Sequence, residues 1–321
     1  MTLVVRCDDR AALAVALGGS RGDRAPVAFV PTMGALHEGH RALVERAATL
    51  APTVVVSIFV NPTQFDAATD LATYPRTLSE DLALLEEVAG ATGVRVVAYV
   101  PSVHDVYPDG AVATVHVPEV TVHLCGARRP GHFDGVATVV DALLRAVRPT
   151  VMILGRKDFQ QLVVVRALVE QAGHDVVIDA APTVRADDGV AISSRNTLLA
   201  PDGRMLARRI PRALAAGVAL VAAARAAGSS VETAALRSAV VQELTVEGLR
   251  IDYVDVVDPL RIVPVEGSHD PELPLLLAVA VHVGDEPATV RLIDNVLLGD
   301  REDELRLLRA SAAGRMTGKG S

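Results

Sequence analysis

Aromatic residues and cysteines are nearly missing from this sequence. Aromatic residues make up 3% of the 321 positions and Trp is absent, whereas hydrophobic residues reach 50%. A buried core must therefore be built mainly from Ala, Val and Leu. The two cysteines, Cys7 and Cys125, form no metal-ligand pattern and no disulfide framework. Such sparing use of cysteine suits a reducing compartment.

Net positive charge and long apolar runs are missing as well. The formal net charge is −8 and the pI is about 5.6. Nucleic-acid-binding proteins usually carry a basic patch and a high pI, so we expect no nucleic-acid partner. No run approaches the roughly 18 uninterrupted apolar residues of a membrane span, and the acidic residues ahead of the N-terminal apolar run are in the wrong order for a signal peptide. We therefore expect a cytoplasmic protein without a membrane partner, and small anionic substrates remain compatible with its charge.

Lysine is the rarest of the basic residues. Of the 31 basic residues only Lys157 and Lys319 are lysines. Lys319 lies in the closing "GRMTGKGS" (314–321), which we expect to be a disordered tail. A lysine retained at position 157 of such an arginine-rich chain indicates a need for a compact, mobile ammonium group there.

Strand-like and helix-like segments alternate through the first half of the chain. Alternation of this kind predicts an α/β domain, whose parallel sheet is covered by helices on both faces and binds ligands at the carboxyl ends of its strands. The expected strands are "VAFVPT" (27–32), "TVVVSIFV" (53–60), "VRVVAYV" (94–100), "VMILG" (151–155) and "DVVIDA" (175–180), and the expected helices are "GHRALVERAATL", "SEDLALLEEVAG", "GVATVVDALLRAV" and "FQQLVVVRALVEQAG".

The pattern changes after about residue 183, which predicts domains at 1–183 and 184–321. The second domain opens with a helical stretch that we expect Pro211 to interrupt. The segment from Ser229 to Glu232 has capping-box spacing ahead of a further helix. Three strand-like segments then follow without long helices between them and predict a small antiparallel sheet, which makes this a smaller α+β domain. They are "IDYVDVV" (251–257), "LPLLLAVAVHV" (273–283) and "TVRLIDNV" (289–296).

The stretch "PTMGALHEGH" joins the first expected strand to a helix. Gly34 and Gly39 permit close backbone approach, and the N-terminus of the following helix favours an anion. His37 and His40 would add two hydrogen-bond donors at that point. The plainer alternative is a strand–turn–helix connection with satisfied surface histidines. A zinc site is not expected, because the helical H-E-x-x-H spacing is incomplete.

This stretch resembles the signature of the pantothenate synthetase family, part of the nucleotidyltransferase superfamily whose H-x-G-H motif binds ATP. The motif alone also fits cytidylyltransferases and class I aminoacyl-tRNA synthetases, but five further segments narrow the resemblance. It implies a Rossmann-like first domain and ATP contacts from Met33, Gly34, His37 and His40.

Two segments imply the substrate site. "SIFVNPTQF" is polar where the second expected strand ends and offers Asn61 and Gln64 to a ligand, and the resemblance assigns Gln64 to pantoate and to the neighbourhood of β-alanine. In "LCGARRPGHFDGVATVV" it assigns Arg129 and His132 to the substrate. Taken without the resemblance, the first segment could be a strand exit turned by Asn-Pro, and the second an exposed basic loop.

A third segment, "YPRTLSEDLALL", carries Glu80 and Asp81 at the start of an expected helix. The resemblance makes both candidates for holding Mg²⁺, which typically takes one or two carboxylates besides substrate phosphates. Acidic residues in a first helical turn are also common as complements to the helix dipole.

The remaining segments imply further nucleotide contacts. In "LGRKDFQQL" the resemblance has Lys157 steadying the phosphates and Gln161 binding pantoate, and Arg156 departs from the family's usual Glu or Gln. "PTVRADDGVAISSRNTLL" matches a mobile loop that closes over ATP, although a serine-rich turn would also explain it. The ATP contacts implied by these two segments are Gly155, Arg156, Lys157, Asp158, Val184, Ile192, Ser193, Ser194 and Arg195.

The function implied is condensation of pantoate with β-alanine through a pantoyl adenylate, with ATP as substrate, Mg²⁺ as cofactor and a homodimer as assembly. His37, His40, Lys157 and Arg195 would carry the catalysis, chiefly by positioning and charge stabilisation. A class I aminoacyl-tRNA synthetase is the first rival, but it needs a basic tRNA-binding module. The second is a catalytically altered nucleotide-binding relative, which Arg156 and the missing lysine at Ala142 leave open.

Overall fold

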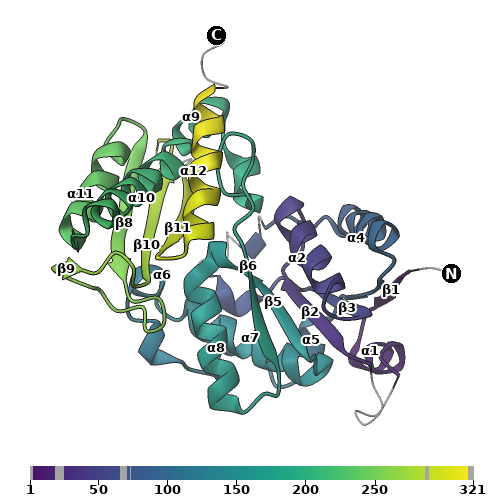
Figure 1. Cartoon of the computed structure of the whole chain (residues 1–321). Coiled ribbons are helices and arrows are strands. Elements are labelled where there is room, and N and C mark those ends of the chain that lie inside the picture. Colours follow the sequence, from purple (N-terminus) through teal and green to yellow (C-terminus); the bar gives the residue numbers. More distant parts are fainter. Residues whose placement is uncertain (1–2, 19–24, 66–70, 73, 286–288, 317–321) are drawn as a thin grey trace. The chain divides into compact units, whose positions relative to one another are not determined.

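A computed structural model describes residues 3–18, 25–65, 71–72, 74–285 and 289–316. The chain divides into two compact units (Figure 1). The first comprises residues 1–156 and 164–181, and the second comprises residues 157–163 and 182–321. The segment 157–163, which follows the fourth expected strand, thus groups with the second unit by its contacts. The domain boundary at 183/184 stays a prediction.

The first unit is built on a six-stranded parallel sheet in the order β1-β4-β3-β2-β5-β6. The predicted α/β class is confirmed, and all five expected strands form. β3 ends two residues and β6 begins two residues inside the range expected for "TVVVSIFV" and "DVVIDA". The strands are β1 (Val4–Cys7), β2 (Val27–Thr32), β3 (Thr53–Ile58), β4 (Arg95–Tyr99), β5 (Val151–Gly155) and β6 (Val177–Ala181).

Sequence reasoning missed β1, because the N-terminal segment was tested only for a signal peptide, which it does not resemble, and was not considered as a strand. Helices cover both faces of the sheet, since side chains alternate along each strand and both sets are buried: Ala28 and Val30 pack with α2 and α4, whereas Phe29 on the other face is also fully buried. The helices of this unit are α1 (Arg10–Ala16), α2 (Glu38–Ala48), α4 (Leu78–Thr92), α5 (Val103–Val106), α6 (Leu124–Arg128), α7 (His132–Val147) and α8 (Phe159–Ala172), with α8 beginning in the segment 157–163.

The second unit contains the predicted antiparallel sheet, in the order β11-β10-β8. Helices α10, α11 and α12 pack on the face of the sheet that carries Leu277, Val279 and Val281. The elements are α9 (Pro201–Ala207), α10 (Arg209–Ala227), α11 (Thr233–Leu244), β8 (Leu249–Val257), β10 (Leu275–Val283), β11 (Val290–Leu298) and α12 (Arg301–Met316).

Two local predictions in this unit were wrong, and a third, the tail, is contradicted only over the three residues that the structure describes. The helix break falls at Arg208, and Pro211 lies in the first turn of α10, where its missing N–H costs nothing. The segment from Ser229 to Glu232 forms no capping box, because Val231 and Glu232 form the short strand β7 that pairs with β9 (Ser268–His269). The expected tail is helical over its first three residues, and its remaining five lie outside the described residues.

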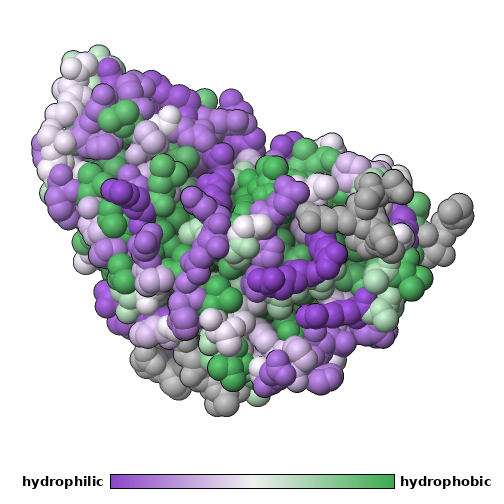
Figure 2. Space-filling model, turned by 90° about the horizontal axis from the view of Figure 1, so that it is seen from below, coloured by the Kyte–Doolittle hydropathy of each residue, from purple (hydrophilic) through white to green (hydrophobic). Residues whose placement is uncertain are grey.

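One stretch of the second unit, Pro201–Ala227, is long and apolar enough to cross a membrane by length and composition. Half of its most apolar window is buried inside the protein, as in a core helix, so the finding is weak evidence for a span. Leu214, Val218 and Val221 of this stretch belong to the core against β10. On the face of the molecule drawn in Figure 2, hydrophilic residues are interspersed with apolar ones.

Candidate active site

The loop between β2 and α2 begins with a tightly held turn. Thr32 donates its hydroxyl to the Ser57 carbonyl at 2.6 Å and accepts the Gly34 N–H at 3.1 Å. Gly34 has a φ of +83°, which favours glycine. A Cβ on Gly34 would also lie 3.0 Å from the Asp81 carboxylate and 3.1 Å from Ile58. Both its conformation and its neighbours therefore call for glycine at this position.

His37 and His40 form a mutual cap at the start of α2. The Nδ1 atom of His37 accepts the Gly39 N–H at 3.1 Å, and the Nδ1 atom of His40 accepts the His37 N–H at 3.3 Å. The two rings stack with centroids 4.1 Å apart. Because each Nδ1 is an acceptor, a neutral imidazole at either position carries its proton on Nε2. The motif therefore supplies two Nε2–H donors at a helix N-terminus, an arrangement suited to an anion.

The two carboxylates predicted to hold magnesium differ in their surroundings. Glu80 is exposed, whereas Asp81 is 1% exposed. Asp81 accepts the N–H groups of Ala35 and Leu36 at 3.1 and 2.7 Å, and its Oδ1 also accepts the Thr77 hydroxyl at 3.2 Å. Asp81 thus secures the turn ahead of the histidines. Among the described residues, no three His, Cys, Asp or Glu side chains are grouped to hold a metal ion.

Asn61 anchors the exit of β3. It is fully buried, and its Nδ2 donates to the Gly135 carbonyl at 3.1 Å. Its Oδ1 accepts the Tyr107 hydroxyl at 2.6 Å and the Thr63 hydroxyl at 3.0 Å. Burial raises the pKa of Tyr107, while its hydrogen bonds with Thr63 and Asn61 oppose the shift, so the phenol stays a neutral donor. The Asn61 amide, predicted to contact substrate, is thus engaged with the protein itself.

Three other predicted substrate residues meet at one point. The backbone carbonyl of Gln64 accepts hydrogen bonds from Arg129 Nη2 at 3.0 Å and His132 Nδ1 at 2.9 Å. Arg129 Nη1 lies 3.3 Å from His132 Nε2. The Gln64 side chain is 9% exposed, and no residue in the described part of the chain hydrogen-bonds its amide. A nearly buried amide of this kind calls for a polar partner, which a substrate can supply.

Lys157 lies in the short 3-10 helix Arg156–Asp158 that follows Gly155, the last residue of β5. Its ammonium lies 3.5 Å from the Asp158 carboxylate and its side chain is 19% exposed. The Lys157 carbonyl accepts the Asn295 side-chain amide at 2.8 Å. Arg156, the departure from the family pattern, acts on Arg166 of α8: burial first, and then the charge of Arg156, lower the pKa of Arg166.

Residues 184–192 of the second unit fold into a short hairpin. Ile192 donates its N–H to the Val184 carbonyl at 3.0 Å, and Arg185 pairs with Ala191 in an antiparallel bridge. Arg185 forms a bidentate ion pair with Asp294 at 2.6 and 3.0 Å. Burial alone would lower the pKa of Arg185, but the Asp294 charge and hydrogen bonds outweigh it and raise that pKa.

The serine-rich segment follows directly on this hairpin. Ser193 accepts the Arg195 N–H at 3.3 Å and donates its own N–H to Asn196 Oδ1 at 2.5 Å, which caps the 3-10 helix Ser194–Leu198. Hydroxyl groups and a guanidinium on one turn form a donor set suited to phosphate.

Comparison with known proteins decides the family. Residues 7–297 match the family model described as pantoate-beta-alanine ligase. The chain belongs to this family. It is 48% identical to the pantothenate synthetase of Syntrophobacter fumaroxidans over 85% of this chain and 90% of that protein, and 44% identical to that of Geobacter sp. (strain M21) over 88% and 95%.

Solved structures of family members share the fold. A pantothenate synthetase from Thermus thermophilus matches with a TM-score of 0.78 and 41% identity, over 91% of this chain and 99% of that one. A pantoate-beta-alanine ligase from Francisella tularensis, described as complexed with beta-gamma ATP and beta-alanine, matches with a TM-score of 0.69 and 29% identity, over 92% of this chain and 97% of that one. The resemblance read from the sequence is therefore confirmed for family and fold.

Sequence reasoning missed several residues that shape this ligase. Tyr107 carried no motif signal, and Gly135 and Arg185 lay unremarked within quoted segments. Asp294 and Asn295 lie in "TVRLIDNV", which was expected to form a strand and was given no role in the site. Their only signal was the placement of polar residues in an otherwise apolar strand, which β11 shares with many edge strands.

Proposed function

We propose that this ligase condenses pantoate with β-alanine in two ATP-dependent steps. The pantoate carboxylate attacks the α-phosphorus of ATP, which forms pantoyl adenylate and releases pyrophosphate. The β-alanine amine then attacks the activated carbonyl, which releases AMP and forms pantothenate. The observation that carries the proposal is the H-x-G-H turn, whose two stacked histidines accept backbone N–H groups at their Nδ1 atoms and lie at the N-terminus of α2, where an anion is favoured.

The nucleotide contacts proposed in the first unit are Met33, Gly34, His37, His40, Gly155 and Arg156, and those in the second are Lys157, Asp158, Val184, Ile192, Ser193, Ser194 and Arg195. His37 and His40 act as hydrogen-bond donors to phosphate oxygens rather than as bases, because their Nδ1 atoms are already acceptors. Lys157 and Arg195 offset charge on the departing pyrophosphate, which develops as the α-phosphorus is attacked.

For the acid substrates we propose a site lined by Gln64, Arg129 and His132, with Gln161 as a further pantoate contact. Arg129 and His132 hold the Gln64 carbonyl, which fixes the backbone from which the Gln64 amide extends. Asn61 acts on the substrate site indirectly in this proposal, by anchoring the turn at the exit of β3. Gln161 lies half-buried in the first turn of α8, and its side chain has no hydrogen bond from the described residues.

The pair Glu80 and Asp81 does not fit a protein-held magnesium ion, because Asp81 is committed to the loop N–H groups and Glu80 is exposed. Magnesium belongs to the ATP substrate in this scheme, held by phosphates and water as is usual for this ion. A cytoplasmic location and a homodimer complete the proposal. Light scattering coupled to gel filtration tests the dimer.

The deciding experiment is ATP–pyrophosphate exchange with and without pantoate. We expect exchange that requires pantoate but neither β-alanine nor tRNA, and that falls on the order of 10²–10³-fold in Lys157→Ala, the typical effect of losing one charge-stabilising donor. Arg145→Ala, which removes an exposed arginine of α7, is the matched control and should leave the rate unchanged. Folded protein that binds ATP without exchange would overturn the proposal in favour of a catalytically altered relative.

A further inference from the structure

Two adjacent residues of β11, Asp294 and Asn295, each hold a different segment proposed to bind phosphate. We infer that they are positioning residues for the adenylation step: Asn295 fixes the backbone of Lys157, and Asp294 fixes the hairpin 184–192 that leads to Ser193 and Arg195. This inference rests on the proposed function, in which those segments contact the ATP phosphates.

Asn295 is the polar residue that reaches the Lys157 backbone. Its Nδ2 donates to the Lys157 carbonyl at 2.8 Å, and the residue as a whole is 6% exposed. Lysine has a long, flexible side chain, so the position of its ammonium depends on how firmly its backbone is fixed. A short 3-10 helix offers few hydrogen bonds of its own, and the Asn295 amide adds one from a neighbouring strand.

Asp294 holds the hairpin through Arg185. The ion pair is 8% and 2% exposed on its two sides, so it is shielded from solvent. Arg185 also donates to the Gly189 carbonyl at 3.2 Å and so spans the hairpin from base to tip. Charge-assisted bidentate pairs fix both distance and orientation. The residue that follows the hairpin is Ser193, so its path is set by this pair.

Because side chains alternate between the two faces of a strand, the adjacent residues Asp294 and Asn295 of β11 can hold two different segments of the chain. Asp294 is paired with Val279 of β10 and shares the helix-covered face, whereas Asn295 is paired with Ala278 and points to the other face. The backbone N–H of Asn295 also donates to Asp294 Oδ1 at 2.8 Å, which ties the Asp294 side chain to the backbone of Asn295. A shift of β11 would therefore move both phosphate-binding segments together.

A double-mutant cycle tests the inference. Asn295→Leu removes the donor with little change in volume, and we expect pantoate-dependent exchange to fall at least tenfold, mainly through a higher KM for ATP. In the Lys157→Ala background the same change should have almost no further effect, because Asn295 acts through Lys157. The second half-reaction, assayed with synthetic pantoyl adenylate and β-alanine, needs no phosphate chain beyond the adenylate and should stay within about twofold of wild type.

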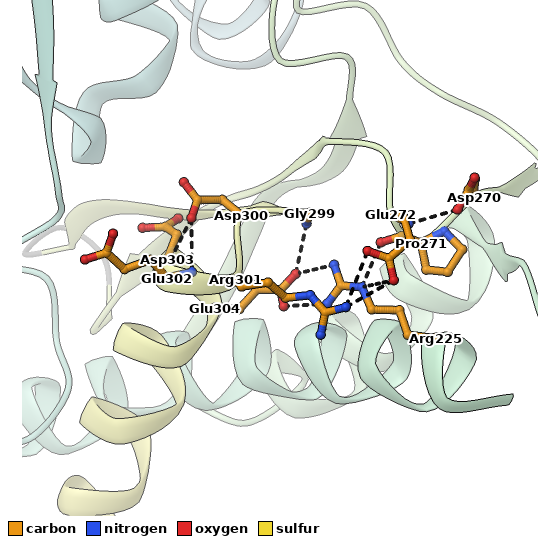
Figure 3. Close-up of polar contacts among 10 residues, drawn as sticks. All are labelled: Arg225, Asp270, Pro271, Glu272, Gly299, Asp300, Arg301, Glu302, Asp303 and Glu304. Carbon is orange, nitrogen blue, oxygen red and sulfur yellow. Dashed lines mark hydrogen bonds and ion pairs between the residues drawn. The ribbon is translucent and has the colours of Figure 1, made fainter. Parts of the chain in front are cut away.

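The controls separate the possible failures. Glu304→Gln perturbs a buried ion pair elsewhere in the second unit (Figure 3) and should leave the KM for ATP unchanged in protein that remains folded. Additive losses in the cycle, or equal losses in both half-reactions, would show that Asn295 is only structural and overturn the inference. Absence of exchange in the wild type would instead overturn the proposed function. Asn295→Gln, which keeps an amide donor, should recover part of the ATP affinity.

Discussion

The second unit contains two buried ion pairs that look alike and differ in what they hold. Arg185 pairs with Asp294 at 2.6 Å, and Arg225 pairs with Glu304 at 2.6 Å with both side chains 5% exposed. The first fixes a hairpin that leads to a proposed phosphate-binding turn. The second ties the end of α10 to the first turn of α12, where Arg225 also donates to the Pro271 carbonyl and Glu304 accepts the Gly299 N–H (Figure 3).

Burial and geometry do not distinguish the two pairs, which differ only in the segments that they hold. Both pairs must offset the cost of removing two charges from water, and such pairs often contribute little net stability. The matched portion of the family model ends at residue 297, ahead of α12. Arg185 and Asp294 both lie within the matched residues, whereas Glu304 and helix α12 lie beyond them.

The largest effect is expected from Asp294→Ala. It leaves the Arg185 charge buried without its carboxylate, which typically lowers the free energy of unfolding by about 3–5 kcal/mol. Pantoate-dependent exchange should also fall at least tenfold in the protein that remains folded. Urea unfolding and exchange rates per folded molecule measure the two losses. Unchanged exchange in folded variant would remove the functional distinction between the two pairs.

Glu304→Ala should reproduce the loss of stability without the loss of activity. The buried Arg225 loses its bidentate partner, so a similar destabilisation of about 3–5 kcal/mol is expected. Exchange per folded molecule and the KM for ATP should match wild type below the unfolding transition. A selective rise in the KM for ATP would mean that α12 also governs the nucleotide segments.

Sequence patterns predicted the layers of this fold better than its local connections. Apolar runs such as "VMILG" have only one place to go in a parallel sheet, so β5 formed where expected. By contrast, a serine followed by a glutamate three residues later marks a helix start only if nothing else pairs with that backbone. In this chain Ser268 and His269, almost forty positions further along, pair with that backbone, so local spacing could not reveal the short strand.

The candidate site shows the same limit. The motifs located His37, His40 and Lys157, because a strand end and a helix start set their positions. They did not reveal that Asp81 is committed to two loop N–H groups, or that Asn61 is surrounded by protein partners. Residue type predicts what a side chain can bind, whereas tertiary contacts determine whether that capacity is already used.

Helix α7 of the first unit offers a second comparison. Gly135, in its first turn, lies against the turn that carries Gln64, whereas Asp141 lies further along the helix, and Gly135→Ala tests the first of these two positions. A Cβ on Gly135 would lie 2.3 Å from the Thr63 carbonyl oxygen, so the turn carrying Gln64 must move. We expect the KM for pantoate to rise about tenfold or more, because small misplacements at a site cost heavily. Gly217→Ala, whose Cβ would lie 2.5 Å from a Leu277 methyl group, is the control and should affect stability alone. An unchanged KM for pantoate would contradict the proposed role of Gln64 in substrate binding.

The smallest effect is expected from Asp141→Asn, in the middle of α7. Asp141 accepts hydrogen bonds from Arg145 and His174 at 2.9 and 2.7 Å. Burial raises the pKa of Asp141, but these two partners outweigh burial and leave that pKa below its usual value. A lowered folded-state pKa stabilises the protein above the unfolded value of about 3.9, and that stabilisation disappears as the pH falls through the folded value.

Wild type should therefore exceed Asp141→Asn in free energy of unfolding by on the order of 1 kcal/mol at pH 5, and the difference should shrink as the pH falls below about 4. Urea unfolding at a series of pH values measures it. Exchange at neutral pH should be equal in the two proteins, because this network holds α7 without touching the turn at Gly135. A pH-independent difference would mean that the Asp141 charge contributes nothing, and a lower exchange rate would extend the functional part of α7 to its middle.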